Sequence, residues 1–242
     1  MKFSDQGVII NVKKYGENSL IVKLFSSSHG IYRAFVRSAK SNKTHNLYQI
    51  GNLISFEFTS RLEEGLGSFI NVDLIESFSG KIIFDKLKLS CAKSLLSMID
   101  ELFLERENQQ SLFLNFKKFL ELIANSNQTK EEIIAAYIKL ELNILENLGY
   151  GLDLTKCAAT GNISNLIFVS PKTGCAVSMQ AGLPYQKKLL NLPQFLIENS
   201  SAISQQQLIE GFKLSGFFLE KFLNEEEFKS KNFKREQIFQ QI

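Results

Sequence analysis

The 242-residue sequence predicts an α+β protein, with a strand-rich N-terminal part and a mainly helical C-terminal part. Up to about residue 79, apolar residues recur with a period of two, in short runs separated by Gly, Asn and Ser, which is typical of strands and turns. After Gly80 the apolar period becomes that of a helix. Because the chain is longer than a usual single domain, we expect two domains, over residues 1–80 and 81–242.

Five strands are expected in the N-terminal part. They cover residues 7–13, 20–26, 30–36, 53–59 and 68–77. Five short strands are too few for a sandwich and suit a small closed barrel of the OB type, because closure removes exposed strand edges. The longest connection joins Val36 to Leu53, and long loops on a rigid barrel often carry function.

Apolar stripes predict three helices at the start of the C-terminal part. They cover residues 82–103, 112–123 and 129–148. The third opens near Thr129, with Glu131 and Glu132 in its first turn, and Gly149 is expected to end it as a left-handed cap. We interpret these Leu-rich and Phe-rich faces as core, since such faces are far more often packing surfaces than ligand sites.

A small β-hairpin is expected to be inserted into the helical domain. Residues 166–179 hold two short apolar runs joined at Pro171, which suits the first central position of a turn. A further helix is expected to begin after Ser204, whose side chain can cap it. The polar, charged tail from Glu225 is expected to fray.

The composition excludes several classes of protein. With 44% hydrophobic and 22% charged residues, the chain is close to the globular average and unlike a disordered or fibrous protein. No apolar run approaches the roughly 18 residues of a membrane span, and Asp5 interrupts the place where a signal peptide would be apolar. Three cysteines without a CxxC pair fit a reducing compartment. We therefore expect a cytoplasmic protein.

The residues favour no enzyme and no cofactor. Lys172 and Thr173 lack the glycines of a phosphate-binding loop. His29 and His45 are the only histidines, both lie in predicted loops, and no G-x-S-x-G turn is present. Cys157 flanks the hairpin, but a structural zinc site needs four close ligands, so we expect no metal there.

Basic residues are concentrated in one interval of the predicted barrel, although the net charge of +3 alone implies no partner. No acid lies between Glu17 and Glu57. An OB barrel commonly binds single-stranded nucleic acid with a basic groove and aromatic stacking platforms, and here Tyr32 and Tyr48 are better platform candidates than Phe35. The predicted binding residues are Lys23, Arg33, Arg37, Lys40, Lys43, Tyr32 and Tyr48. A solvated basic rim is the alternative interpretation of the cations.

Six motifs occur in a characteristic order along the chain. They are RLEEGLGSF at 61–69, LGYGLDL at 148–154, CAATG at 157–161, FVSPKTG at 168–174, AGLPY at 181–185 and LLNLP at 189–193. In order and spacing they resemble the RecO family of bacterial DNA repair and recombination mediators. The resemblance runs from Phe3 to about Leu196.

The resemblance implies an OB barrel followed by a helical domain, in a protein that binds single- and double-stranded DNA and anneals strands without hydrolysing nucleotides. Its partners would be RecR, in some species RecF, and single-stranded DNA-binding protein, whose acidic tail would bind the helical domain while RecA is loaded. Some members hold zinc with four cysteines near the hairpin. Here Thr160 occupies one of those positions, and Cys175 stands where relatives commonly have Arg.

Two other classes stay open from the residues alone. An OB module that binds RNA, joined to a helical protein-interaction domain, would share the same basic interval and aromatic residues. Its affinities for RNA and DNA of equal length would separate the two. A metal-dependent hydrolase would need a cluster of ligands that the sequence does not supply.

Overall fold

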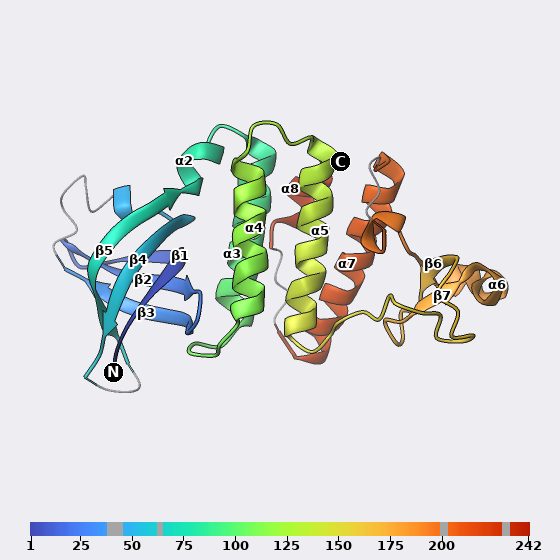
Figure 1. Cartoon of the computed structure of the whole chain (residues 1–242), viewed down its shortest axis with the longest axis horizontal. Helices are drawn as coiled ribbons and strands as arrows, with labels where there is room; N and C mark the ends of the chain where they lie inside the picture. Colours follow the sequence, from blue (N-terminus) through green and yellow to red (C-terminus); the bar gives the residue numbers. More distant parts are fainter. Residues whose placement is uncertain (38–45, 62–64, 199–202, 229–232) are drawn as a thin grey trace. The chain divides into compact units, whose positions relative to one another are not determined.

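The computed structural model describes the chain except for residues 38–45, 62–64, 199–202 and 229–232. It divides into two compact units, Met1–Ser126 and Asn127–Ile242. The first unit holds the five-stranded barrel and the three helices that follow it (Figure 1). These helices group with the barrel by their contacts, and the predicted sequence boundary at residue 80 stays a prediction.

The barrel consists of five strands. They are β1 (Lys2–Tyr15), β2 (Ser19–Ser26), β3 (Gly30–Val36), β4 (Asn52–Thr59) and β5 (Gly67–Ser77). They close in the order β1-β2-β3-β5-β4, with β3 and β5 parallel and the other neighbours antiparallel. This is the OB-type barrel that the alternating pattern predicts, so the α+β fold class is confirmed.

The barrel core includes both tyrosines that were expected to be open platforms. Tyr32 and Tyr48 are only 4% and 7% exposed, so the prediction that they present free ring faces is wrong. For Tyr32 the reason is strand parity: in β3, Tyr32 and Ala34 point into the core, and Phe35 points outward and stays half-exposed. Tyr48 lies outside the strands, in a turn before β4 that packs on the same core. Burial raises the pKa of Tyr48 to about 12.

Three helices complete the first unit. They are α2 (Phe78–Ile82), α3 (Lys86–Leu102) and α4 (Gln110–Ala124). The single stripe expected over residues 82–103 is therefore interrupted, because Asp85 begins α3 by accepting a hydrogen bond from the backbone N–H of Lys88 at 3.0 Å. Phe25, on the outer side of β2, meets the ring of Phe113 on α4 at a centroid distance of 5.4 Å. These helices cover one end of the barrel wall.

The second unit combines helices with a small sheet. Its elements are α5 (Lys130–Asn147), β6 (Leu166–Val169), β7 (Ala176–Ser178), α6 (Met179–Gly182), η1 (Leu183–Lys188), β8 (Leu190–Asn191), η2 (Gln194–Leu196), α7 (Gln205–Glu225) and α8 (Arg235–Phe239). Thr129 and Ser204 form capping boxes at α5 and α7, as their sequence positions predict. Gly149 has a φ of 87°, so the left-handed cap is also confirmed. The predicted hairpin is present, and β8 adds a third strand to it.

The described end of the C-terminal tail, residues 233–242, packs on the second unit where fraying was expected. Phe233 and Ile238 are buried, and Arg235 donates to the buried carboxylate of Glu141 at 2.6 Å. Its guanidinium lies 4.0 Å from the ring centre of Phe212. Burial lowers the pKa of Arg235, but the charge of Glu141 outweighs it and raises that pKa. The prediction was wrong because the acid that Arg235 neutralises lies far away in the sequence.

Candidate nucleic-acid interface

The outer side of β1, β2 and β3 presents two rings and two cations near the β1–β2 turn, and a third cation, Lys14, lies at its edge. In the ladder, Ile21 of β2 pairs with Lys13 of β1 and with Phe35 of β3, so these three lie on one face. Tyr15, two residues beyond Lys13, contacts Phe35 at a centroid distance of 5.6 Å and an interplanar angle of 86°. The strand register thus brings the end of β1 and the end of β3 together on either side of β2.

We define the β1–β3 face as Lys13, Tyr15, Phe35 and Arg37, together with Lys14 at its edge. Lys14 pairs with Leu20, which pairs with the core residue Val36, so by strand alternation it lies on the other side of β1 from Lys13 and Tyr15. Arg37 directly follows β3 and is exposed, as are both lysines. Tyr15 is 59% exposed, which leaves its ring accessible to a stacking base. Within the described part of the chain, none of the three cations takes part in an ion pair.

Two of the predicted binding cations are already paired. The Nζ atom of Lys23 lies 2.6 Å from Oδ1 of Asp100 and 2.9 Å from its carbonyl oxygen, and this pair is largely buried. The Nε atom of Arg33 lies 2.5 Å from Oε1 of Glu105. Because a neutralised cation attracts phosphate less, we leave both outside the β1–β3 face.

The remaining predicted cations lie in the connection between β3 and β4. Lys40 and Lys43 fall outside the described residues, so their contribution to binding stays a prediction. Arg37 is the last described residue before that connection. The face and the connection are therefore continuous along the chain.

Sequence reasoning missed Lys13, Lys14 and Tyr15. They lie just before Glu17, and the search for an acid-free interval began after that residue. The missed signal was two lysines and a tyrosine at the end of a strand, directly before Gly16 in a turn. In an antiparallel hairpin such residues lie beside the next strand, here β2, and the outward Phe35 of β3 lies on the other side of that strand.

Comparison with known sequences identifies the family. A family model described as "Recombination protein O N terminal" matches residues 1–78, and "Recombination protein O C terminal" matches residues 83–232. The chain belongs to the RecO family. RecO is a family of DNA repair and recombination proteins, and the resemblance that the motifs suggested is confirmed.

Two curated RecO relatives show how far the similarity extends. The chain is 40% identical over 230 residues to "DNA repair protein RecO" of Wolbachia sp. subsp. Drosophila simulans (strain wRi), covering 92% of both chains. It is 38% identical over 223 residues to the protein of that name from Rickettsia peacockii (strain Rustic), covering 92% of this chain and 91% of the relative. The similarity to RecO thus spans both units.

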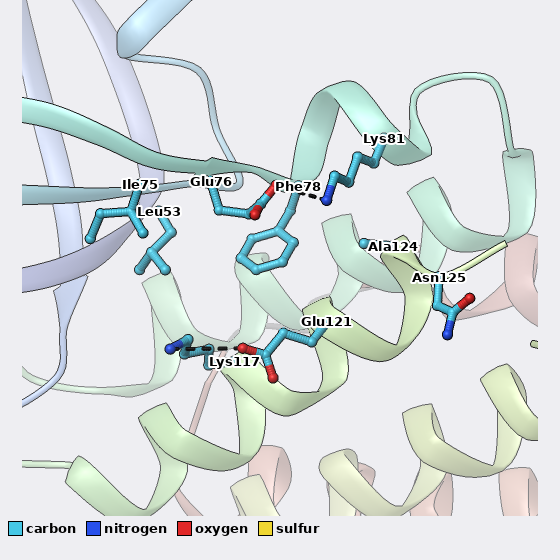
Figure 2. A pocket seen from close by; sticks show the side chains of 9 residues that line it. All are labelled: Leu53, Ile75, Glu76, Phe78, Lys81, Lys117, Glu121, Ala124 and Asn125. Carbon is cyan, nitrogen blue, oxygen red and sulfur yellow. Dashed lines mark ion pairs between the residues drawn. The ribbon is translucent and has the colours of Figure 1, made fainter.

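A pocket in the first unit is a weaker binding candidate for this RecO chain. It has a volume of about 330 Å³ and is lined by residues of β4, β5, α2 and α4. Figure 2 shows that its two lysines are paired: Lys81 lies 2.9 Å from Glu76, and Lys117 lies 3.7 Å from Glu121. With its charges balanced, the pocket offers no unpaired cation to a phosphate.

Cys157, which flanks the hairpin, is buried and hydrogen-bonded. The Sγ atom of Cys157 accepts a hydrogen bond from the backbone N–H of Ser178 at 3.2 Å. Burial raises the pKa of Cys157, but hydrogen bonds from the side chains of Ser178 and Thr160 and from two backbone N–H groups outweigh it and lower that pKa to about 6. Among the residues that the structure describes, no three His, Cys, Asp or Glu side chains are grouped to hold a metal.

No helix in the described part of the chain is long and apolar enough to cross a membrane.

Proposed function

We propose that this RecO-family chain binds single-stranded DNA on the β1–β3 face and acts as a recombination mediator that anneals complementary strands. The observation that carries the proposal is the group of exposed cations, Lys13, Lys14 and Arg37, near the contacting rings of Tyr15 and Phe35. Among the described residues none of the three cations has an ion-pair partner. Cations neutralise phosphates, and an exposed ring stacks on a base of any identity. The binding is therefore largely independent of sequence.

Annealing follows from charge neutralisation. Two strands repel each other along their phosphates, and a protein that neutralises one strand while leaving its base edges open lowers the barrier to pairing. In the proposed complex, Tyr15 stacks on a base face and leaves the edges of that base free. The reaction needs no covalent step, so the proposal assigns no catalytic residue, metal or nucleotide.

The proposed partners follow from membership of the RecO family. Together with RecR, and in some species RecF, the chain would help RecA displace single-stranded DNA-binding protein. The acidic, Phe-terminated tail of that protein would bind the helical part, with lysines attracting its carboxylates and an apolar pocket holding its ring. Because charges steer the tail and the ring anchors it, binding should weaken with salt and be nearly lost without the terminal Phe.

An annealing assay tests the chemical part of the proposal. The full chain should anneal complementary strands in EDTA and without ATP, and it should bind single-stranded DNA at least as tightly as RNA of equal length. Loss of annealing on chelation would show that a metal is required. A clear preference for RNA would instead support the RNA-binding alternative.

A loading assay tests the biological part. With RecR present, the full chain should restore RecA assembly on DNA precoated with single-stranded DNA-binding protein. The matched control omits RecR. If RecA assembles equally with and without the chain, the mediator role is wrong even if annealing is observed.

A further inference from the structure

A second acid-free interval lies in the second unit. The chain holds 25 acids in 242 residues, about one in ten, yet residues 154–197 contain none. The interval carries four lysines: Lys156, Lys172, Lys187 and Lys188. We call residues 154–197 the hairpin module, since they include β6, β7 and β8.

All four lysines of the hairpin module are exposed. Within the described residues none of them takes part in an ion pair. A fifth lysine lies beside them, because the Nζ atom of Lys221 donates to the carbonyl oxygen of Lys172 at 3.0 Å, but it is paired with Glu225 and is not counted with the four. The module therefore presents positive charge from several separate loops.

Three acids near the hairpin module have other partners, and a fourth, Glu198, directly follows it. Asp153 accepts hydrogen bonds from Thr155, which lower the pKa of Asp153. Glu210 of α7 accepts hydrogen bonds from the side-chain amides of Asn191 and Gln206, at 2.9 and 2.8 Å. Glu225 lies 4.0 Å from Lys221. In the described part of the chain neither Glu210 nor Glu225 forms an ion pair with a module lysine, whereas the charge of Lys156 also contributes to the lowered pKa of Asp153.

An exposed aromatic ring accompanies the charges. Tyr185 is 62% exposed, and Leu183 beside it is 52% exposed. Both belong to the 3₁₀ helix η1, in which side chains three residues apart lie on the same side. Tyr185 therefore shares one side of η1 with Lys188, as a ring and a cation that can contact adjoining parts of a nucleotide.

We propose that the hairpin module is a second DNA-binding surface, which holds the second strand during annealing. The inference rests on the proposed function and adds to it a site for the other substrate strand. Lysines on separate loops suit a ligand with regularly repeated charges, which a phosphate backbone has. The exposed ring of Tyr185 suits stacking on a base rather than insertion into a pocket. Both features favour a nucleic acid over an acidic peptide.

The test uses the full chain and two matched variants. The module variant replaces Lys156, Lys172, Lys187 and Lys188 with Ala. The control variant replaces Lys86, Lys93, Lys139 and Lys213, which are also exposed and lie on α3, α5 and α7. Both variants lose the same charge, and thermal unfolding checks that both remain folded.

Strand capture is the measurement. The protein is bound to an immobilised single strand, and a labelled non-complementary strand is then added. The module variant should bind the first strand within about twofold of the parental protein. It should capture the second strand, and anneal complementary strands, at least about tenfold less well. The reason is that each lost phosphate contact lowers the salt slope of binding by about 0.7. The control variant should behave like the parental protein.

A second variant tests the ring without changing the charge. Tyr185→Ala should lower capture of the second strand about tenfold, because base stacking on the ring is lost. It should leave binding of the first strand unchanged. If Tyr185→Ala captures the second strand as the parental protein does, stacking on this ring is not part of the site.

The remaining outcomes separate the two proposals. If the parental protein binds no DNA, the proposed function and this inference both fail. If it anneals and the module variant anneals equally well, only the inference fails. If the module variant loses binding of the first strand as much as capture of the second, the module is part of the first binding site. It is then not a second surface, and the inference is wrong. Loss of binding to a short poly-aspartate peptide, with strand capture intact, would assign the module to an acidic protein partner instead.

Discussion

The two ends of the barrel wall formed by β1, β2 and β3 differ in what covers them. At one end, Phe25 of β2 packs against rings of α4, and Lys23 is paired with Asp100 of α3. At the other end, Lys13 and Tyr15 of the same wall stay exposed. Since the strands are continuous, the helices packed on them decide which cations remain available for a ligand.

This difference shows why local charge density is an incomplete guide to a binding site. Lys23 lies in an interval free of acids, but its partner Asp100 comes from a helix far along the chain. Lys13 lies outside that interval and near Glu17, yet no acid pairs with it in the described residues. The comparison predicts DNA-binding effects at the open end and stability effects at the covered end.

The largest effect is expected when the three open cations are removed together. Replacing Lys13, Lys14 and Arg37 with Ala should reduce the salt slope of single-stranded DNA binding by about 2, because each lost phosphate contact removes about 0.7. At about 0.1 M salt this corresponds to roughly a hundredfold weaker binding. Affinity is measured by fluorescence anisotropy over a range of salt concentrations.

The control for this experiment replaces Lys86, Lys93 and Lys118, three exposed lysines on α3 and α4 of the same unit. It should leave the slope nearly unchanged. Equal slopes for the two triple variants would mean that the cations of the β1–β3 face are only a solvated rim.

At the covered end, Lys23→Ala should affect stability rather than DNA binding. It leaves the largely buried carboxylate of Asp100 without its cation, which should lower the free energy of unfolding by about 2 kcal/mol. Chemical denaturation measures this loss, with Lys93→Ala, an exposed site on the same helix, as the control. If Lys23→Ala is as stable as the parental protein but binds DNA more weakly, the assignment of Lys23 to stability and not to DNA binding is wrong.

A smaller effect is expected from a single ring at the open end. Tyr15→Ala should weaken single-stranded DNA binding about tenfold, since one stacking interaction is worth about 1–3 kcal/mol. Tyr32→Phe is the matched control, because it keeps the buried ring and removes only the hydroxyl. If the control weakens binding as much as Tyr15→Ala, the assignment of the open ring is wrong.

The smallest effect is expected from Asp5 of β1, whose carboxylate accepts hydrogen bonds from the β2–β3 turn. This turn lies at the end of β2 away from the β1–β3 face. Burial raises the pKa of Asp5, but hydrogen bonds from Ser27, His29, Gln6 and Ser28 outweigh it and lower that pKa below its ordinary 3.8. The ionised form thus stabilises the fold fully above about pH 4, and this stabilisation is lost as the pH falls through the folded-state pKa. Asp5→Asn should lower the free energy of unfolding by about 1 kcal/mol at pH 7.

The same comparison at pH 3 tests the sign of this effect. There the difference between Asp5→Asn and the parental protein should shrink, because the parental carboxyl is itself becoming protonated. A difference that is equal at the two pH values would show that the carboxylate charge contributes nothing. Asp73→Asn, at an exposed acid of β5, serves as the control.

The regular elements of the fold were largely predictable, because they depend on local signals. The period of two placed β3 at residues 30–36, as observed, and Thr129 and Ser204 marked the starts of their helices. The closed five-stranded barrel also followed from the OB interpretation. Such signals act within a few residues of one another.

The candidate site was less predictable, because it depends on parity and on distant partners. A shift of one residue decides whether Tyr32 or Phe35 points outward, and pattern reasoning chose the wrong ring. The partners of Lys23 and Arg235 lie 77 and 94 residues away in sequence, beyond the reach of any local pattern. The ordered α8 was missed for the same reason.

Photocrosslinking from a single position is the most direct test of the β1–β3 face. A photoreactive phenylalanine derivative replaces either Tyr15, which lies in the face, or Phe84, which is fully exposed in the same unit but outside the face. Each full-length protein is irradiated with labelled single-stranded DNA. We expect several-fold more crosslinking from position 15 than from position 84, and equal or reversed yields would contradict the β1–β3 face as the DNA interface.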